Sequence, residues 1–118
     1  LKGLEPHVGA SVVHPDMEED GWTFRTDFPG ATGDRLMALP FLRDLYLRAD
    51  PRATTRVTVP VLWDRERGTI VSNESSEIIR MLNAAFDAWG DAAVDFYPEP
   101  LRGDIDAWNE RVYGSINN

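Results

Sequence analysis

The chain contains no cysteine. This absence excludes a disulfide framework, a thiolate metal site and a thiol nucleophile within these residues. Only two histidines occur among 118 residues, so a zinc site is not expected. The sequence also lacks an apolar run of about 18 residues and a signal-peptide pattern. We therefore expect no membrane partner and a cytoplasmic location.

Positive charge is also scarce. Twelve Lys and Arg residues stand against 20 Asp and Glu, which gives a formal charge of −8. Nucleic acid and acidic membranes require a basic surface, so neither is an expected partner. An apolar content of 42% and four tryptophans indicate a folded chain of about one domain's length. Because it begins at Leu1 rather than at methionine, we expect a piece of a longer protein.

The apolar pattern and the Pro and Gly positions predict an order of helices and strands. Residues 1–5 resemble the last turn of a helix, and the residues from Ile105 onward resemble the apolar face of another helix, after a linker-like Tyr-Pro-Glu-Pro run at 97–100. Asn73 and Gly90 are the predicted caps of the clearest helix. Between the ends we predict strands at 9–14, 21–24, 56–64 and 69–71, and helices at 40–50 and 74–89. One strand and the rest of a helix added at the front would complete the βαβαββα order of a thioredoxin-like α/β fold, with helices on both sheet faces.

The most informative stretch is residues 56–64, an apolar strand with Pro60 in its middle. Proline removes a ladder donor and is therefore not expected inside a central strand unless the backbone there has another use. A cis Val59–Pro60 bond would bend the strand and present free backbone groups to a ligand. Glu74 and Ser75 fall in the first turn of the following helix, whose unpaired N–H groups suit a carboxylate. Together these features predict a site for an extended, peptide-like anion.

Simpler interpretations exist for each of these features. Pro60 fits an ordinary edge strand, Glu74 and Ser75 fit helix capping alone, and a tryptophan such as Trp22 more often packs in a core than against a ligand. The acidic stretch at 16–20 lies near His14, but its spacing matches no metal-ligand set, so a solvated loop is the better interpretation. The consistent order and spacing of the first three features favours binding.

Seven runs of this sequence resemble the glutathionyl-hydroquinone reductases, the Xi class of glutathione transferases. They are residues 1–5, 11–15, 21–24, 28–34, 45–51, 56–64 and 70–80. Val-Pro followed by Glu-Ser is common to most glutathione transferases. Gly-Trp-Thr-Phe at 21–24 and Phe-Pro-Gly-Ala-Thr-Gly-Asp at 28–34 point to this class in particular.

The resemblance implies a fold and a domain division. Residues 1–96 would form the thioredoxin-like glutathione-binding domain without its first strand, and residues 97–118 the linker and first helix of a C-terminal α-helical domain. The full-length protein would be a homodimer without a metal. Its substrates would be glutathione and a glutathionyl-hydroquinone, which a cysteine thiolate reduces to the hydroquinone before a second glutathione regenerates the thiol.

The resemblance also assigns a glutathione cradle, while the catalytic residues fall outside the chain. The cysteine is expected upstream of Leu1, and a tyrosine beyond Asn118, past an Asn-Asn-Gly run that the chain enters at Asn117; Tyr113 does not match that position. Glu74 would take the γ-glutamyl ammonium and Ser75 the carboxylate, while the Val59 backbone would pair with the cysteinyl part. Pro60 is the structural cis-proline. The predicted glutathione-binding residues are Trp22, Arg56, Val57, Thr58, Val59, Glu74 and Ser75.

A second hypothesis stays open beside the enzyme. The chain would then be a non-catalytic thioredoxin-like module that keeps the tripeptide groove and serves glutathione binding or assembly. Its one supporting feature is the absence of cysteine from the 118 residues.

Overall fold

The fold was analysed in a computed structural model, which describes residues 1–116. Asn117 and Asn118, where the Asn-Asn-Gly run is predicted to begin, lie outside the described residues. The chain divides into two compact units. One is Val8–Ile78, and the other is Leu1–His7 together with Ile79–Asn118.

Helix α1 (Leu42–Ala49) carries the core of the first unit. Leu42, Leu45 and Tyr46 recur at helical spacing, so their side chains share one face, and all three are buried. The helix ends before Pro51, because the residue preceding a proline is driven out of helical geometry. Asp50 is accordingly extended, with φ −146° and ψ 111°. The sequence prediction of a helix here is confirmed.

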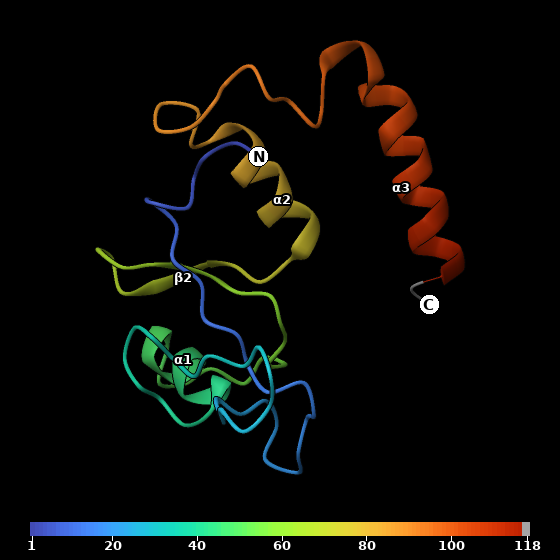
Figure 1. The fold of residues 1–118 in the computed structure, drawn as a ribbon. Coiled ribbons are helices and arrows are strands. Elements are labelled where there is room, and N and C mark those ends of the chain that lie inside the picture. The colour runs from blue at the N-terminus through green and yellow to red at the C-terminus, as the bar shows by residue number, and fades with distance from the viewer. Residues whose placement is uncertain (117–118) are drawn as a thin grey trace. The chain divides into compact units, whose positions relative to one another are not determined.

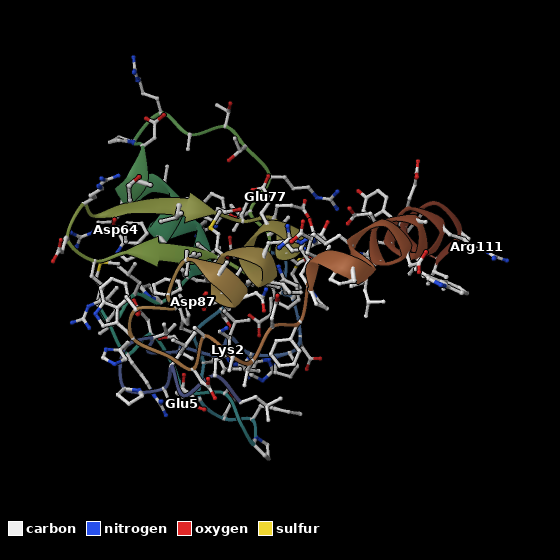
Figure 2. All side chains as sticks on the ribbon, turned by 90° about the horizontal axis from the view of Figure 1, so that it is seen from above. Lys2, Glu5, Asp64, Glu77, Asp87 and Arg111 are labelled. Carbon is white, nitrogen blue, oxygen red and sulfur yellow. The ribbon has the colours of Figure 1, made fainter. Side chains whose placement is uncertain are left out.

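A β-hairpin packs on α1 in this unit (Figure 1). It consists of β1 (Leu62–Asp64) and β2 (Thr69–Ser72), which pair antiparallel. The Asp64 carboxylate accepts the backbone N–H groups of Glu66 and Arg67, each at 2.9 Å, and so fixes the turn at one end of the hairpin (Figure 2). Ladder pairing begins only at Leu62. The expected strand over 56–64 is therefore too long, since Pro60 has no N–H to donate.

The two other predicted strands are reduced to isolated bridges. Val12 pairs with Gly33, Gly21 with Glu18, and Thr23 with Phe41. The His14 N–H donates to the Thr23 carbonyl at 2.9 Å, so the two predicted segments do meet, but without a run of consecutive ladder bonds. Residues 1–4 have no regular secondary structure and a turn covers residues 5–7, so the predicted end of a helix at 1–5 is not formed. Within residues 1–116 the sheet is two-stranded.

The class-specific run at 28–34 ends in a loop organised by Asp34. Its carboxylate accepts backbone N–H groups of Leu36, Met37 and Leu39 at 2.9, 3.3 and 3.0 Å. Gly33 has φ +71°, and a Cβ added there would lie 3.2 Å from a Thr26 methyl group. Glycine is required by both the backbone conformation and the close approach. This loop leads directly into α1.

The second unit joins the N-terminal segment to the residues from Ile79 onward, which include the second half of α2 (Ser75–Ala84). Lys2 is buried, and its ammonium lies 3.0 Å from the Asp87 carboxylate (Figure 2) and 2.5 Å from the Val94 carbonyl. The Asp91 N–H donates to the Lys2 carbonyl at 2.8 Å. A Cβ on Gly90 would lie 2.7 Å from that carbonyl, so Gly90 permits the close approach. Helix α2 itself ends at Ala84, five residues earlier than the sequence predicts.

A polar cluster connects α2, the linker and α3 (Arg102–Ile116), which follows a short 3-10 helix (Glu99–Leu101). The Arg80 guanidinium lies 2.9 Å from the Asp106 carboxylate and stacks 3.3 Å from the centroid of the Tyr97 ring. The Tyr97 hydroxyl donates to the other Asp106 oxygen at 2.5 Å. The predicted helix from Ile105 onward is confirmed, but its Trp108 is exposed rather than packed within this chain.

Asp106 makes the stability of this cluster depend on pH. The hydrogen bond from Tyr97, and then that from Arg80, lowers the pKa of the Asp106 carboxyl below its ordinary value. A carboxyl with a lowered folded-state pKa stabilises the fold above its unfolded pKa of about 4, and this contribution is lost as the pH falls through the lower value. We expect Asp106→Asn to lower the melting temperature at pH 7, with the difference from wild type shrinking as the pH falls below the unfolded pKa of about 4. Asp104→Asn, an exposed acid on the same helix, is the control. A difference that persists unchanged at low pH would contradict this account.

Candidate functional site

The segment 56–60 precedes the hairpin and forms no strand. Val57 and Thr58 are half-buried, whereas Arg56, Val59 and Pro60 are exposed. The Val59–Pro60 peptide bond is cis. Within residues 1–116 the backbone N–H and C=O of Val59 have no hydrogen-bond partner. These groups are available to a ligand that brings its own main chain.

Thr58, the residue before Val59, is held by hydrogen bonds to Tyr46 of α1. The Tyr46 hydroxyl accepts the Thr58 N–H at 3.2 Å and donates to the Thr58 carbonyl at 3.0 Å. The amide of Asn73 donates to the same hydroxyl at 3.1 Å and to the Thr58 Oγ1 at 3.3 Å. Three segments that are separate in the sequence therefore meet at one phenolic oxygen.

The start of α2 follows Asn73 directly. The expectation that Asn73 caps this helix is wrong, because α2 begins at Ser75 and, within residues 1–116, the Asn73 side-chain oxygen accepts no N–H group of its first turn; the NH2 group of Asn73 donates to Tyr46 and Thr58 instead. The Ser72 hydroxyl instead accepts the Glu74 N–H at 3.1 Å and donates to Glu77 at 2.9 Å. In the part of the chain that the structure describes, the backbone N–H groups of Ser75, Ser76 and Glu77 have no partner. These free donors lie at the positive end of the helix dipole.

The side chains at this helix start offer two kinds of contact. Glu74 is exposed and accepts one hydrogen bond at 3.3 Å, from the Ser76 hydroxyl. Its carboxylate has no cationic partner within residues 1–116. The Ser75 hydroxyl is exposed and makes no recorded hydrogen bond to another described residue. An acceptor and several donors thus stand side by side, as a zwitterionic head group requires.

Trp22 packs against the core of the unit Val8–Ile78. Its side chain is half-buried and packs against the core of Leu42, Leu45 and Tyr46, as Val57 does. Its carbonyl accepts the Leu42 N–H at 2.9 Å. The structure thus brings Trp22 and Val57 to the same core, while Thr58 and Asn73 meet at Tyr46. Sequence reasoning missed Tyr46, because its position on the apolar face of a predicted helix signals only core packing.

Two further features of the first unit lie outside this group. A hollow of about 410 Å³ is lined by Leu36, Met37, Arg48, Trp63, Arg65 and Gly68, and contains none of the predicted glutathione residues. Among residues 1–116 no three or more His, Asp or Glu side chains are grouped as metal ligands would be. His14, near the acidic stretch, is buried and accepts the Asp16 N–H at 3.2 Å.

Comparison with known proteins shows the family. Residues 1–85 match the family described as glutathione S-transferase, N-terminal domain. The chain belongs to this family. Its fold class is therefore the thioredoxin-like α/β domain of the glutathione transferases, as the sequence predicts.

The similar proteins also confirm the resemblance to the Xi class. The chain is 59% identical over 118 residues to the glutathionyl-hydroquinone reductase YqjG of Escherichia coli K12, and 47% identical to the glutathionyl-hydroquinone reductase PcpF of Sphingobium chlorophenolicum. The two alignments cover the whole of this chain but only 36% of the length of YqjG and 37% of the length of PcpF. The glutathione-bound structure of YqjG superposes with a TM-score of 0.93 over 99% of this chain and 38% of that one. A Xi-class transferase from Natrialba magadii, 49% identical, also gives 0.93 over 100% of this chain and 36% of its own.

Proposed function

We propose that the protein containing this chain is a glutathione-dependent reductase of glutathionyl-hydroquinones, and that these residues supply its glutathione cradle. The observation that carries the proposal is that two neighbouring parts of the unit Val8–Ile78 each carry backbone hydrogen-bonding groups without a partner among residues 1–116. Among residues 1–116, the backbone N–H and C=O of Val59 have no hydrogen-bond partner, and the first turn of α2 has three N–H groups without one, next to Glu74. The relatives named as glutathionyl-hydroquinone reductases support the same reaction.

Each part of glutathione has a complement among these groups. The cysteinyl residue would pair antiparallel with the Val59 backbone, exchanging two main-chain hydrogen bonds. The α-carboxylate of the γ-glutamyl end would bind the Ser75 hydroxyl and the free N–H groups of α2, where the helix dipole favours an anion. Its ammonium would bind Glu74 through a charge-assisted hydrogen bond. Trp22 would lie against the tripeptide, Arg56 would place a cation on the same segment, and Val57 and Thr58 would shape it.

The chemistry requires a thiolate that these 118 residues do not contain. In the proposed reaction a cysteine thiolate outside this chain attacks the sulfur of the glutathionyl-hydroquinone. The carbon–sulfur bond breaks, the ring carbon takes the electron pair and then a proton, and the hydroquinone leaves. The resulting mixed disulfide is attacked by the thiolate of a second glutathione, which releases glutathione disulfide and restores the cysteine thiolate. The cradle would hold glutathione in both steps.

The proposal extends to the assembly and location of the protein. A homodimer and a cytoplasmic location follow from the resemblance to the family. No helix within residues 1–116 is both long enough and apolar enough to cross a membrane.

The test uses the full-length protein that contains this chain. We expect calorimetric titration to show glutathione binding, and a glutathionyl-hydroquinone incubated with glutathione to yield hydroquinone and glutathione disulfide in equal amounts. Glutathione binding without hydroquinone release would favour the non-catalytic module. The absence of glutathione binding would refute both.

A further inference from the structure

We infer that Tyr46 is a positioning residue of the glutathione site, whose hydroxyl sets the backbone of the cradle and couples its two halves. This inference rests on the proposed glutathione function. It concerns a residue that would not touch glutathione and acts through Thr58 and Asn73. The contacts that carry it all lie within the unit Val8–Ile78.

The position of the hydroxyl is set by the core. Tyr46 is 6% exposed and packs with Leu42 and Leu45, so its ring cannot leave the α1 face without opening the core. Its oxygen lies at hydrogen-bond distance from both backbone groups of Thr58. The Tyr46 hydroxyl thus makes the two hydrogen bonds to the Thr58 backbone that a residue of a neighbouring strand would make.

This contact decides which edge of the segment is free. In a strand-like segment, successive residues direct their N–H and C=O groups to opposite edges. Thr58 uses both groups on Tyr46, whereas Val57 and Val59 make no backbone hydrogen bond within residues 1–116. By holding Thr58 inward, Tyr46 presents the flanking Val59 groups outward, to the place where the cysteinyl main chain would lie.

The same oxygen connects this segment to the helix start. A phenolic hydroxyl has one donor and two acceptor positions. Here the donor is used by the Thr58 carbonyl, and the acceptors by the Thr58 N–H and the Asn73 amide. Asn73 immediately precedes Glu74, so the phenol fixes the segment that would bind the cysteinyl part relative to the groups that would bind the γ-glutamyl head.

Tyr46→Phe in the full-length protein tests this role. The ring remains, but three hydrogen bonds are lost together. We expect the KM for glutathione to rise about 5- to 30-fold, because the backbone N–H and C=O of half-buried Thr58 would lose their partner and the Asn73 amide would lose its contact to that segment. The kcat at saturating glutathione should stay within about twofold of the wild-type value. A substitution that weakens glutathione binding equally in the ground state and in the transition state raises KM and leaves kcat unchanged.

A second ligand separates positioning from stability. Cysteinylglycine lacks the γ-glutamyl head and engages only one half of the cradle. Wild type should therefore bind glutathione more tightly than cysteinylglycine. The ratio of the two affinities should be smaller in Tyr46→Phe, and also smaller in Asn73→Ala. Leu45→Val is the matched control, because it weakens the same core and leaves the hydroxyl contacts intact; it should lower the melting temperature without changing the preference.

The outcomes are distinct. A Tyr46→Phe protein with an unchanged KM for glutathione would overturn the inference. Equal losses of affinity for glutathione and cysteinylglycine would also overturn it, because they would show that Tyr46→Phe acts only through the stability of the core. A wild-type protein that does not bind glutathione would instead remove the proposed function on which the inference rests.

Discussion

Glu74→Gln in the full-length protein is expected to weaken glutathione binding about 10- to 150-fold. The carboxylate is exposed, lies beside the free N–H groups of α2 and has no cationic partner within residues 1–116. It is therefore available to the γ-glutamyl ammonium, and a hydrogen bond to a charged group contributes about 1.5–3 kcal/mol. Glutamine retains the shape and the oxygen that accepts from Ser76 but removes the charge. Calorimetric titration with glutathione measures the loss.

Two controls make this result specific. Glu19→Gln removes an exposed charge from the acidic loop and should leave the affinity unchanged. A glutathione analogue without the α-amino group should bind wild type and Glu74→Gln with similar affinity. The analogue carries no ammonium, so it cannot form the proposed hydrogen bond to the Glu74 carboxylate in either protein. Equal losses for glutathione and the analogue would show that Glu74 acts through the fold and not through the ammonium.

Leu42→Ala is expected to lower the free energy of unfolding by about 2–5 kcal/mol, the range for truncating a well-packed leucine. Leu42 is 3% exposed and lies at the centre of the core that α1 shares with Trp22, Val57 and the hairpin. The cavity would form beneath the cradle, so glutathione affinity should fall with stability. Urea denaturation followed by circular dichroism measures the change, with an unaltered m-value if compactness is retained.

The same substitution on the opposite face of α1 is the control. Leu47 is 45% exposed, so Leu47→Ala should change the stability by no more than about 0.5 kcal/mol. Similar losses for the two variants would mean that helix propensity, and not the core, determines the stability of α1.

Local patterns were sufficient for several elements. The spacing of Leu42, Leu45 and Tyr46 together with Pro51 predicts α1, because both signals act within a few residues of the chain. The turn chemistry around Gly68 similarly predicts the hairpin. The family runs predicted the fold class, which the comparisons confirm.

Other features were predicted with wrong limits. The strand assigned to 56–64 begins only at Leu62, and those assigned to 9–14 and 21–24 form only isolated bridges. Strand formation depends on a partner at the right distance along consecutive residues, and an apolar run alone does not contain that information. The Asn73 cap was predicted wrongly because α2 begins one residue later, at Ser75, and the Asn73 side chain donates to Tyr46, a residue 27 positions away.

Residue types and their order along the chain were enough to predict a helix start near Glu74 and Ser75, because helix caps and dipoles are local properties; that this helix start binds an anion stays a prediction. Which backbone groups remain free within residues 1–116, and that the Tyr46 hydroxyl contacts both Thr58 and Asn73, emerged only from the folded chain. Tyr46 reaches Thr58 across 12 residues and Asn73 across 27, and each contact depends on α1 packing where it does. Hydrogen bonds of this kind arise from distances in space, which burial of the Leu42 face establishes and the order of residues does not reveal.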